Sequence, residues 1–246
     1  MRSRTAWTGV LGLALAMAGC TLRSRPIRTL PGIEVDPEAG RVAVEGRICI
    51  QQGIIEYLAV ASEGKTYESV VELACRPSQL HAAMLIAGYC PGNLPAGLRG
   101  DFAPQAAPVS QPAGAPSIPP PPGDYWSRPE SPTRLAIDLE TRRGNTWTCR
   151  PIEEFLIDRR TGRCPAPLTW AFTGSFFERS PTSGREEFAA DVQRSIVAVW
   201  YDPTALLNLA QDAGNPYRGE QLGFQVNQEA LPAMGTPVRL VFRRVR

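Results

Sequence analysis

The chain has 246 residues, with 26 lysine and arginine residues, 24 aspartate and glutamate residues and one histidine. This near-balance of charge argues against nucleic acid as a partner and against the steering of acidic substrates. The length allows one domain, or one domain with an added lobe, after an N-terminal signal is removed.

Residues 1–19 have the pattern of a lipoprotein signal peptide. Arg2 and Arg4 supply the positive end, a short apolar run follows, and Met17-Ala18-Gly19-Cys20 forms a lipobox. The apolar run is too short for a stable transmembrane helix. We therefore expect cleavage before Cys20, acylation of Cys20, and a protein anchored by lipid to a membrane outside the cytoplasm. The anchor is expected in the outer membrane or on the periplasmic side of the cell membrane, and Thr21 favours the outer membrane if the cell is Gram-negative.

Residues 20–32 are polar, rich in arginine, and are predicted to be a tether. From residue 33 to residue 246 we expect one domain, interrupted at 103–123 by a segment with eight prolines and almost no charge. Such a segment cannot bury a core and is predicted to be a disordered insertion with no specific role.

Alternating apolar residues predict strands over most of the remaining chain, and tryptophans in these strands are expected to pack in the core. A helix is predicted at about 77–88, because Leu80, Ala83, Met84 and Ala87 form one apolar stripe between Pro77 and Gly88. A second helix is predicted at about 203–210, after Asp202. These elements predict an α+β fold, in which an antiparallel sheet predominates and two short helices pack on it.

Five cysteines follow Cys20, and an oxidising compartment predicts two disulfides and one free thiol. Cys149 and Cys164 flank a turn-rich segment and are the best candidates for one pair. Cys75 and Cys90 flank a predicted helix that is too long for a disulfide to span, so Cys49 could reach either of them. No close cysteine pair supports a zinc or iron–sulfur site, and no metal or other cofactor is expected.

Several motifs resemble the YdjY-like domain, a family of bacterial envelope proteins. They are Glu68-Ser69-Val70-Val71, then a Pro-Ser step, LHAAMLIAG (80–88) and Pro91-Gly92, and later WAFTGS (170–175), SIVAVWYDPTALLNL (195–209) and LPAMGTPVRLVF (231–242). The resemblance covers most of residues 40–100 and 133–243. It implies an envelope protein but no known chemistry, and this chain has Tyr67 where the family usually has histidine.

Glu68, Ser69 and His81 form the candidate functional cluster, because they lie near one another in the sequence and include the one histidine. The first hypothesis is a non-enzymatic domain that binds another envelope component, either protein or polymer. The alternative is a serine hydrolase that uses Ser69 or Ser175 with His81, although no G-x-S-x-G motif supports it. A weaker alternative is a metal or redox carrier that uses the cysteines.

Overall fold

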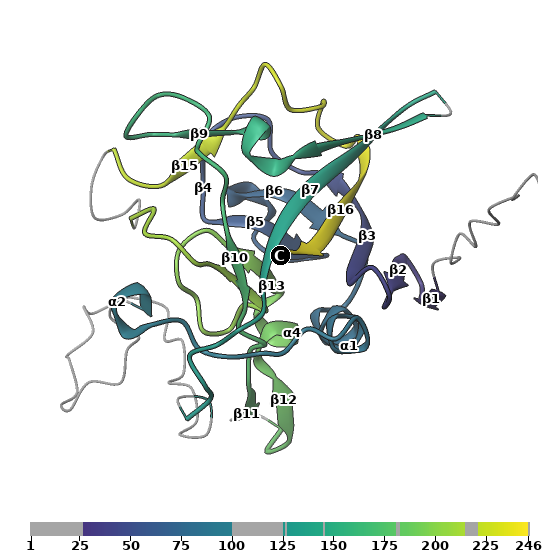
Figure 1. The fold of residues 1–246 in the computed structure, drawn as a ribbon, viewed down its shortest axis with the longest axis vertical. Helices are drawn as coiled ribbons and strands as arrows, with labels where there is room; N and C mark the ends of the chain where they lie inside the picture. Colours follow the sequence, from purple (N-terminus) through teal and green to yellow (C-terminus); the bar gives the residue numbers. More distant parts are fainter. Residues whose placement is uncertain are drawn as a thin grey trace, which may run out of the picture.

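The computed structural model describes residues 27–99, 125, 127–144, 146–180, 183–214 and 221–245. Its main sheet closes on itself, because the last strand in the order, β6, also pairs with β3 (Figure 1). The closed ring runs β3 (Arg41–Ile48), β16 (Pro237–Arg244), β7 (Arg134–Arg143), β10 (Trp170–Phe172), β14 (Leu207–Leu209), β13 (Ser195–Ala198), β5 (Tyr57–Ala61) and β6 (Ser69–Leu73). The protein is therefore a mostly β structure built on a closed eight-stranded barrel, and the predicted α+β fold is wrong.

The predicted helix at 203–210 is replaced by a turn and by strand β14. The Asp202 carboxylate accepts hydrogen bonds from the Thr204 backbone N–H and hydroxyl, at 2.8 and 2.7 Å. The Asn208 side chain accepts a bond from the Asp202 N–H at 2.7 Å. These local bonds satisfy the backbone in a tight turn and compete with a helix. Residues 207–209 then pair with β13 and β10.

Three long neighbouring strands, β3, β16 and β7, form the most regular part of the barrel wall. Because side chains alternate along a strand, one set of each strand faces the core and the other faces outward. The inward set includes Val42, Val44, Leu139, Leu240 and Phe242, all essentially inaccessible to solvent. The outward set is largely charged, and this difference places a polar surface over an apolar interior.

Helix α1 (Pro77–Ile86) confirms the first predicted helix. Of the predicted apolar stripe, Leu80, Ala83 and Met84 are buried in the helix and Ala87 is buried directly after it. The helix is followed by Gly88 in the left-handed conformation, with φ of 76°. Helix α1 packs beside strand β2 and helix α4 at one end of the barrel (Figure 1).

Smaller elements decorate the barrel. Strand β8 extends β7 as a hairpin, the β11–β12 hairpin projects beyond α4, and β1 and β2 continue the sheet outside β3 (Figure 1). The bounds of the remaining elements are β1 (Ile27–Leu30), β2 (Ile33–Asp36), β4 (Ile54–Ile55), η1 (Thr66–Glu68), α2 (Ala96–Arg99), β8 (Thr146–Pro151), η3 (Ile152–Phe155), β9 (Leu156–Asp158), β11 (Phe177–Arg179), β12 (Glu186–Phe188), α4 (Ala189–Gln193) and β15 (Phe224–Val226).

The signal peptide 1–19, the lipidation residue Cys20, most of the tether and the insertion 103–123 lie outside the described residues. Strands from both sides of that insertion belong to the same barrel: β5, β6 and β3, which precede it, lie next to one another in the ring, and the other five strands follow it in the sequence. In the part of the chain that the structure describes, no helix has the length and apolar character needed to cross a membrane.

Candidate binding groove

The structure separates the members of the predicted cluster. Ser69 lies at the start of β6, fully buried, and its hydroxyl donates to the Lys65 carbonyl at 2.7 Å. Glu68 lies beside Lys65, whose ammonium is 3.1 Å from its carboxylate. His81 lies on α1 between two aromatic rings, with centroid distances of 5.3 Å to Phe172 and 5.4 Å to Phe188. Neighbours in sequence therefore have different neighbours in space.

The second serine of the hydrolase hypothesis lies nearer to the histidine. A Cβ placed on Gly174 would be 3.5 Å from His81 Nε2, so the imidazole packs against the turn that contains Ser175. However, Ser175 is fully buried and its hydroxyl accepts a hydrogen bond from the Ala190 N–H at 3.1 Å. The pKa of His81 is lowered, first by burial and then by the Arg128 guanidinium. The ring is thus held neutral in the wall of the fold beside a hydroxyl that a substrate does not reach.

The cysteines Cys49, Cys75, Cys90, Cys149 and Cys164 are all free thiols in the structure. The proposed partners Cys149 and Cys164 are not joined: Cys149 lies on β8 opposite Glu140, and Cys164 lies 3.7 Å from the Asn227 side-chain nitrogen. Burial raises the pKa of both Cys49 and Cys75 to about 12, which keeps these thiols protonated at neutral pH. Among the described residues, no group of three or more histidine, cysteine, aspartate or glutamate side chains is arranged to hold a metal ion.

Among the described residues, one surface feature with the chemistry of a binding site is a groove of about 800 Å³ on the outer face of the barrel. It crosses β6, β3, β16, β7 and β8, and we call it the barrel groove. Its lining residues are Glu45, Gly46, Arg47, Ser62, Glu72, Ala74, Arg142, Gly144, Trp147, Thr236, Pro237, Val238 and Arg239.

Strand pairing explains why charged side chains gather there. On β3, Glu45 and Arg47 are two residues apart and share the outward face. Arg239 of β16 lies directly opposite Glu45, and on its other side it lies opposite Glu140 of β7. The outward side chains therefore form a row of alternating sign across the strands, which favours the antiparallel pairing.

Trp147 and Arg239 form one end of the barrel groove. The Arg239 guanidinium lies 4.3 Å from the centroid of the Trp147 ring, in a cation–π contact. Arg239 is itself held by Glu140, at 2.8 Å, and by Glu34, at 3.2 Å. The indole is 38% exposed, whereas Trp170 in the core is inaccessible. Trp147 is thus a partly exposed aromatic surface at the end of the groove, in contact with Arg239.

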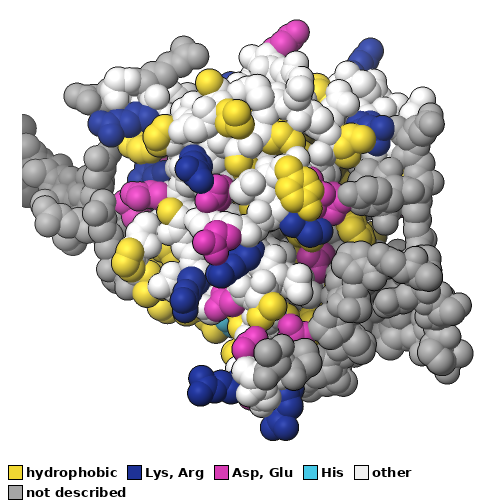
Figure 2. Space-filling view, turned by 180° about the vertical axis from the view of Figure 1, so that it is seen from behind, with side chains coloured by type: hydrophobic (Ala, Val, Ile, Leu, Met, Phe, Trp, Pro, Cys, Tyr) yellow, Lys and Arg dark blue, Asp and Glu magenta, His cyan; other side chains and the backbone are white. Residues whose placement is uncertain are grey.

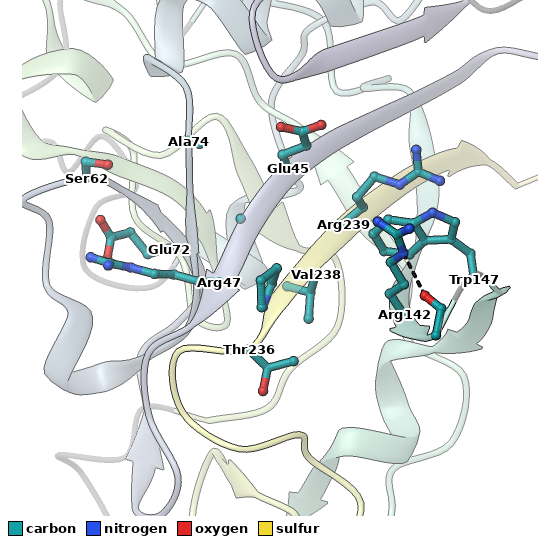
Figure 3. A pocket seen from close by; sticks show the side chains of 13 residues that line it. Glu45, Arg47, Ser62, Glu72, Ala74, Arg142, Trp147, Thr236, Val238 and Arg239 are labelled. Atoms are coloured by element: carbon teal, nitrogen blue, oxygen red, sulfur yellow. Dashed lines mark hydrogen bonds and ion pairs between the residues drawn. The ribbon is translucent and has the colours of Figure 1, made fainter.

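Polar groups continue along the groove from this aromatic end. Figure 3 shows Arg142 beside Trp147, and Arg47 and Glu72 at the opposite end, with Glu45 between them. Arg47 donates two hydrogen bonds to Glu72, at 3.0 and 2.8 Å, although its side chain is 63% exposed. The pKa of Arg47 is raised by the hydrogen bond and charge of Glu72. Donors and acceptors therefore stand side by side along an open surface.

The sequence does not predict this groove, because tryptophan in a strand is expected in the core. The pattern Thr146-Trp147-Thr148-Cys149 does identify a strand, but both faces of that strand are exposed. Trp147 lies opposite Arg142 on β7, and this charged partner on the same face of the hairpin is a signal that the face looks outward. Comparisons of the chain with protein-family models, with curated proteins and with solved structures find no match.

Proposed function

We propose that the protein is a lipid-anchored envelope lipoprotein whose barrel binds another envelope component through the barrel groove, without catalysis. The lipobox ending at Cys20 and the resemblance to the YdjY-like domain support the location, and membership of that family is part of the proposal. The single observation that carries the binding role is the exposed Trp147, in cation–π contact with Arg239, at the end of a groove lined by donors and acceptors.

Of the two ligand types expected, protein or polymer, the groove favours a sugar polymer. A pyranose ring presents an apolar C–H face that packs on an aromatic ring, and its hydroxyls both donate and accept hydrogen bonds. Trp147 supplies the aromatic face, Arg47 and Arg142 supply donors, and Glu45 supplies an acceptor. The mixed signs of these charges suit a ligand with many hydroxyls better than a strongly charged ligand of one sign.

Isothermal titration calorimetry of the protein with soluble fragments of envelope glycan tests this role, because its signal does not depend on Trp147. Trp147→Ala should weaken binding by roughly tenfold, because the stacking surface is lost. The matched control is Tyr67→Ala, which removes another exposed aromatic side chain that does not line the groove. Binding that is equally strong in wild type and Trp147→Ala would reject the groove as the site.

Acylation is tested separately. We expect wild-type protein in the membrane fraction with a mass increased by its acyl chains, and Cys20→Ser without this mass increase. A wild-type protein that carries no acyl chain would reject the anchor and leave the groove experiment unaffected.

The serine-hydrolase alternative has less support, because Ser69 and Ser175 are both fully buried and their hydroxyls are already hydrogen-bonded. A broad serine-reactive probe gives a direct comparison. Labelling of the wild type that is lost in His81→Ala would favour the hydrolase, and we expect no labelling. The metal or redox alternative is disfavoured by the raised thiol pKa values of Cys49 and Cys75.

A further inference from the structure

Helix α1 carries an apolar surface on its outer side as well as on its inner side. Its sequence, PSQLHAAMLI, contains no charged residue. Leu85 is 45% exposed and Ile86 is 49% exposed, and Ala82 is exposed next to them. A surface helix ordinarily places charged or polar side chains on its solvent face. We call His81, Ala82, Leu85 and Ile86 the outer face of α1.

The apolar surface continues beyond the helix. The His81 ring contacts Phe188, and Phe188 contacts the exposed Phe177 of the β11–β12 hairpin, with ring centroids 5.1 Å apart. On α4, Val192 is also exposed, and α4 packs against α1. Figure 2, seen from behind, shows hydrophobic side chains gathered along the lower left of the described surface, around the one histidine.

The path of the chain places this surface beside the point where the described chain begins. Strand β1 begins at Ile27, which pairs with Val35 near the end of β2, just before the turn to β3. The Tyr89 hydroxyl, three residues beyond α1, donates to the Gly40 carbonyl in that turn at 2.7 Å. The chain therefore enters the barrel at the same end as the C-terminal part of α1 (Figure 1).

The distance from Cys20 to the barrel is short. Seven residue steps separate Cys20 from Ile27, and a fully extended chain spans about 24 Å over that length. An acyl chain on Cys20 would hold Ile27, and the end of the barrel that carries α1, within that distance of the bilayer surface. An apolar face so close to lipid would gain free energy by entering the interface.

Basic side chains flank this face. Arg76 is exposed at the N-terminal end of α1, and Arg244 donates to the Ala87 carbonyl at 2.7 Å at the other end. The acidic Asp191 of α4 is already bonded to the Ser78 backbone N–H and hydroxyl, at 2.8 and 2.7 Å. Guanidinium groups at both ends of the helix face favour a surface that contains anionic lipid, whereas Glu178 and Glu187 of the β11–β12 hairpin oppose it in part.

We infer that the outer face of α1, with Phe177, docks on the lipid surface and forms a second membrane contact beside the acylated Cys20. This inference rests on the proposed lipid anchor. It orients the molecule, because the barrel end with α1 and β1 then faces the bilayer. The other end of the barrel, where β3 ends and β16 begins near Met234 and Arg47, then faces away from the bilayer.

Vesicle flotation tests the inference with a chain that begins at Thr21 and has no acyl group. Every strand pairing that the structure describes begins at Ile27 or later, so we expect this chain to retain the described fold. With vesicles of phosphatidylethanolamine and phosphatidylglycerol, we expect a measurable fraction of the protein to float. The double variant Leu85→Ser/Ile86→Ser should lower the partition coefficient by roughly tenfold.

The matched control is Met234→Ser, which changes a 67% exposed apolar residue next to the opposite end of β3 and should leave flotation unchanged. Wild-type protein that does not float, or a double variant that floats equally well, would overturn the inference. Wild-type self-association that the double variant abolishes would assign the face to a second copy of the chain and overturn it too. Because the assay needs neither Cys20 nor the groove, flotation should persist in Trp147→Ala even if the proposed function fails.

Discussion

Glu56 is buried beside a second carboxyl group, that of Glu68, and this environment raises its pKa to about 7. Burial is the largest cause, and the charge of Glu68 is the next. Lys65 opposes the shift, with its ammonium 3.7 Å from Glu56, whereas Asp202 adds to it. A glutamate in the unfolded chain titrates at about 4.3. The folded protein thus binds this proton more tightly, and its stability should fall as the pH rises from about 4.5 to about 7.

We predict that Glu56→Gln flattens this pH dependence, because an amide remains neutral at every pH. Urea unfolding at pH 5 and pH 8 should show a difference in unfolding free energy that is smaller in the variant by on the order of 2 kcal/mol. Glu63→Gln, at an exposed glutamate whose ion pair with Arg194 is 3.8 Å long, is the control and should behave as wild type. An unchanged pH dependence in Glu56→Gln would show that Glu56 does not carry the proton.

Individual residues of the site were harder to predict from the sequence than the strands that carry them. Closeness along the chain predicts a cluster of Glu68, Ser69 and His81, yet a strand followed by a helix carries these residues to different neighbours. The sequence predicts a core position for Trp147, because tryptophan in a strand usually packs there. In the structure the Trp147 side chain points outward instead, opposite Arg142 and against Arg239, which Glu140 holds in place. Arg239 is distant in the sequence, so its position beside Trp147 becomes known only from the folded sheet.

At the scale of elements, the turn Thr173-Gly174-Ser175 links strand β10, helix α1 and the segment that contains Arg128. Gly174 and Ser175 have φ values of 80° and 52°, and the second of these is strained for a residue with a side chain. Arg128 donates to the carbonyls of Thr173, at 2.9 Å, and Ser175, at 2.8 Å. Two charge-assisted bonds thus hold the strained turn against His81.

We predict that Arg128→Met lowers the unfolding free energy by about 2–3 kcal/mol, because both carbonyls lose a charged donor. It should also raise the pKa of His81, since the Arg128 charge helps to lower it. The protein has one histidine, so NMR titration of its ring protons reports this pKa directly. Arg179→Met, at an exposed arginine of β11, is the control. A His81 pKa that does not rise in Arg128→Met would contradict this account of the turn.

Local sequence patterns reflect only neighbouring residues. They therefore predict most elements, but they give the wrong element at 203–210. The apolar stripe of α1 and the alternation in β3, β7 and β16 are properties of neighbouring residues, so they are visible in the sequence. The segment 203–210 also has helical composition, but Asp202 and Asn208 bond to the backbone there and form a turn. Such side-chain bonds depend on how β13 and β14 are placed, and composition does not reveal that placement.

At the scale of the molecule, the closed barrel depends on pairings between distant parts of the chain. β3, near the start of the domain, pairs with β16, near the end of the chain. The short pairing between β3 and β6 closes the ring of strands. No local pattern encodes which strand closes the ring, so the sequence predicted a sheet and missed the barrel. One residue does mark the closure: a Cβ on Gly46 would lie 2.5 Å from the Glu72 carbonyl oxygen. Only glycine permits the two backbones to approach so closely.

We therefore predict that Gly46→Ala opens the barrel at the β3–β6 contact and lowers the unfolding free energy by about 2–4 kcal/mol. Gly46 is not among the residues with positive φ, so the loss measures the steric clash and not backbone strain. Gly97→Ala is the control, because a Cβ there meets nothing within 4 Å and alanine favours its helix.

Hydrogen exchange should locate the damage at the Ala74 amide, which bonds to the Glu45 carbonyl at 2.9 Å. Since Glu45, Arg47 and Glu72 adjoin this contact, Gly46→Ala should also weaken ligand binding in the barrel groove. A variant as stable as wild type, with unchanged exchange at Ala74, would mean that β3 and β6 do not close the barrel at this point.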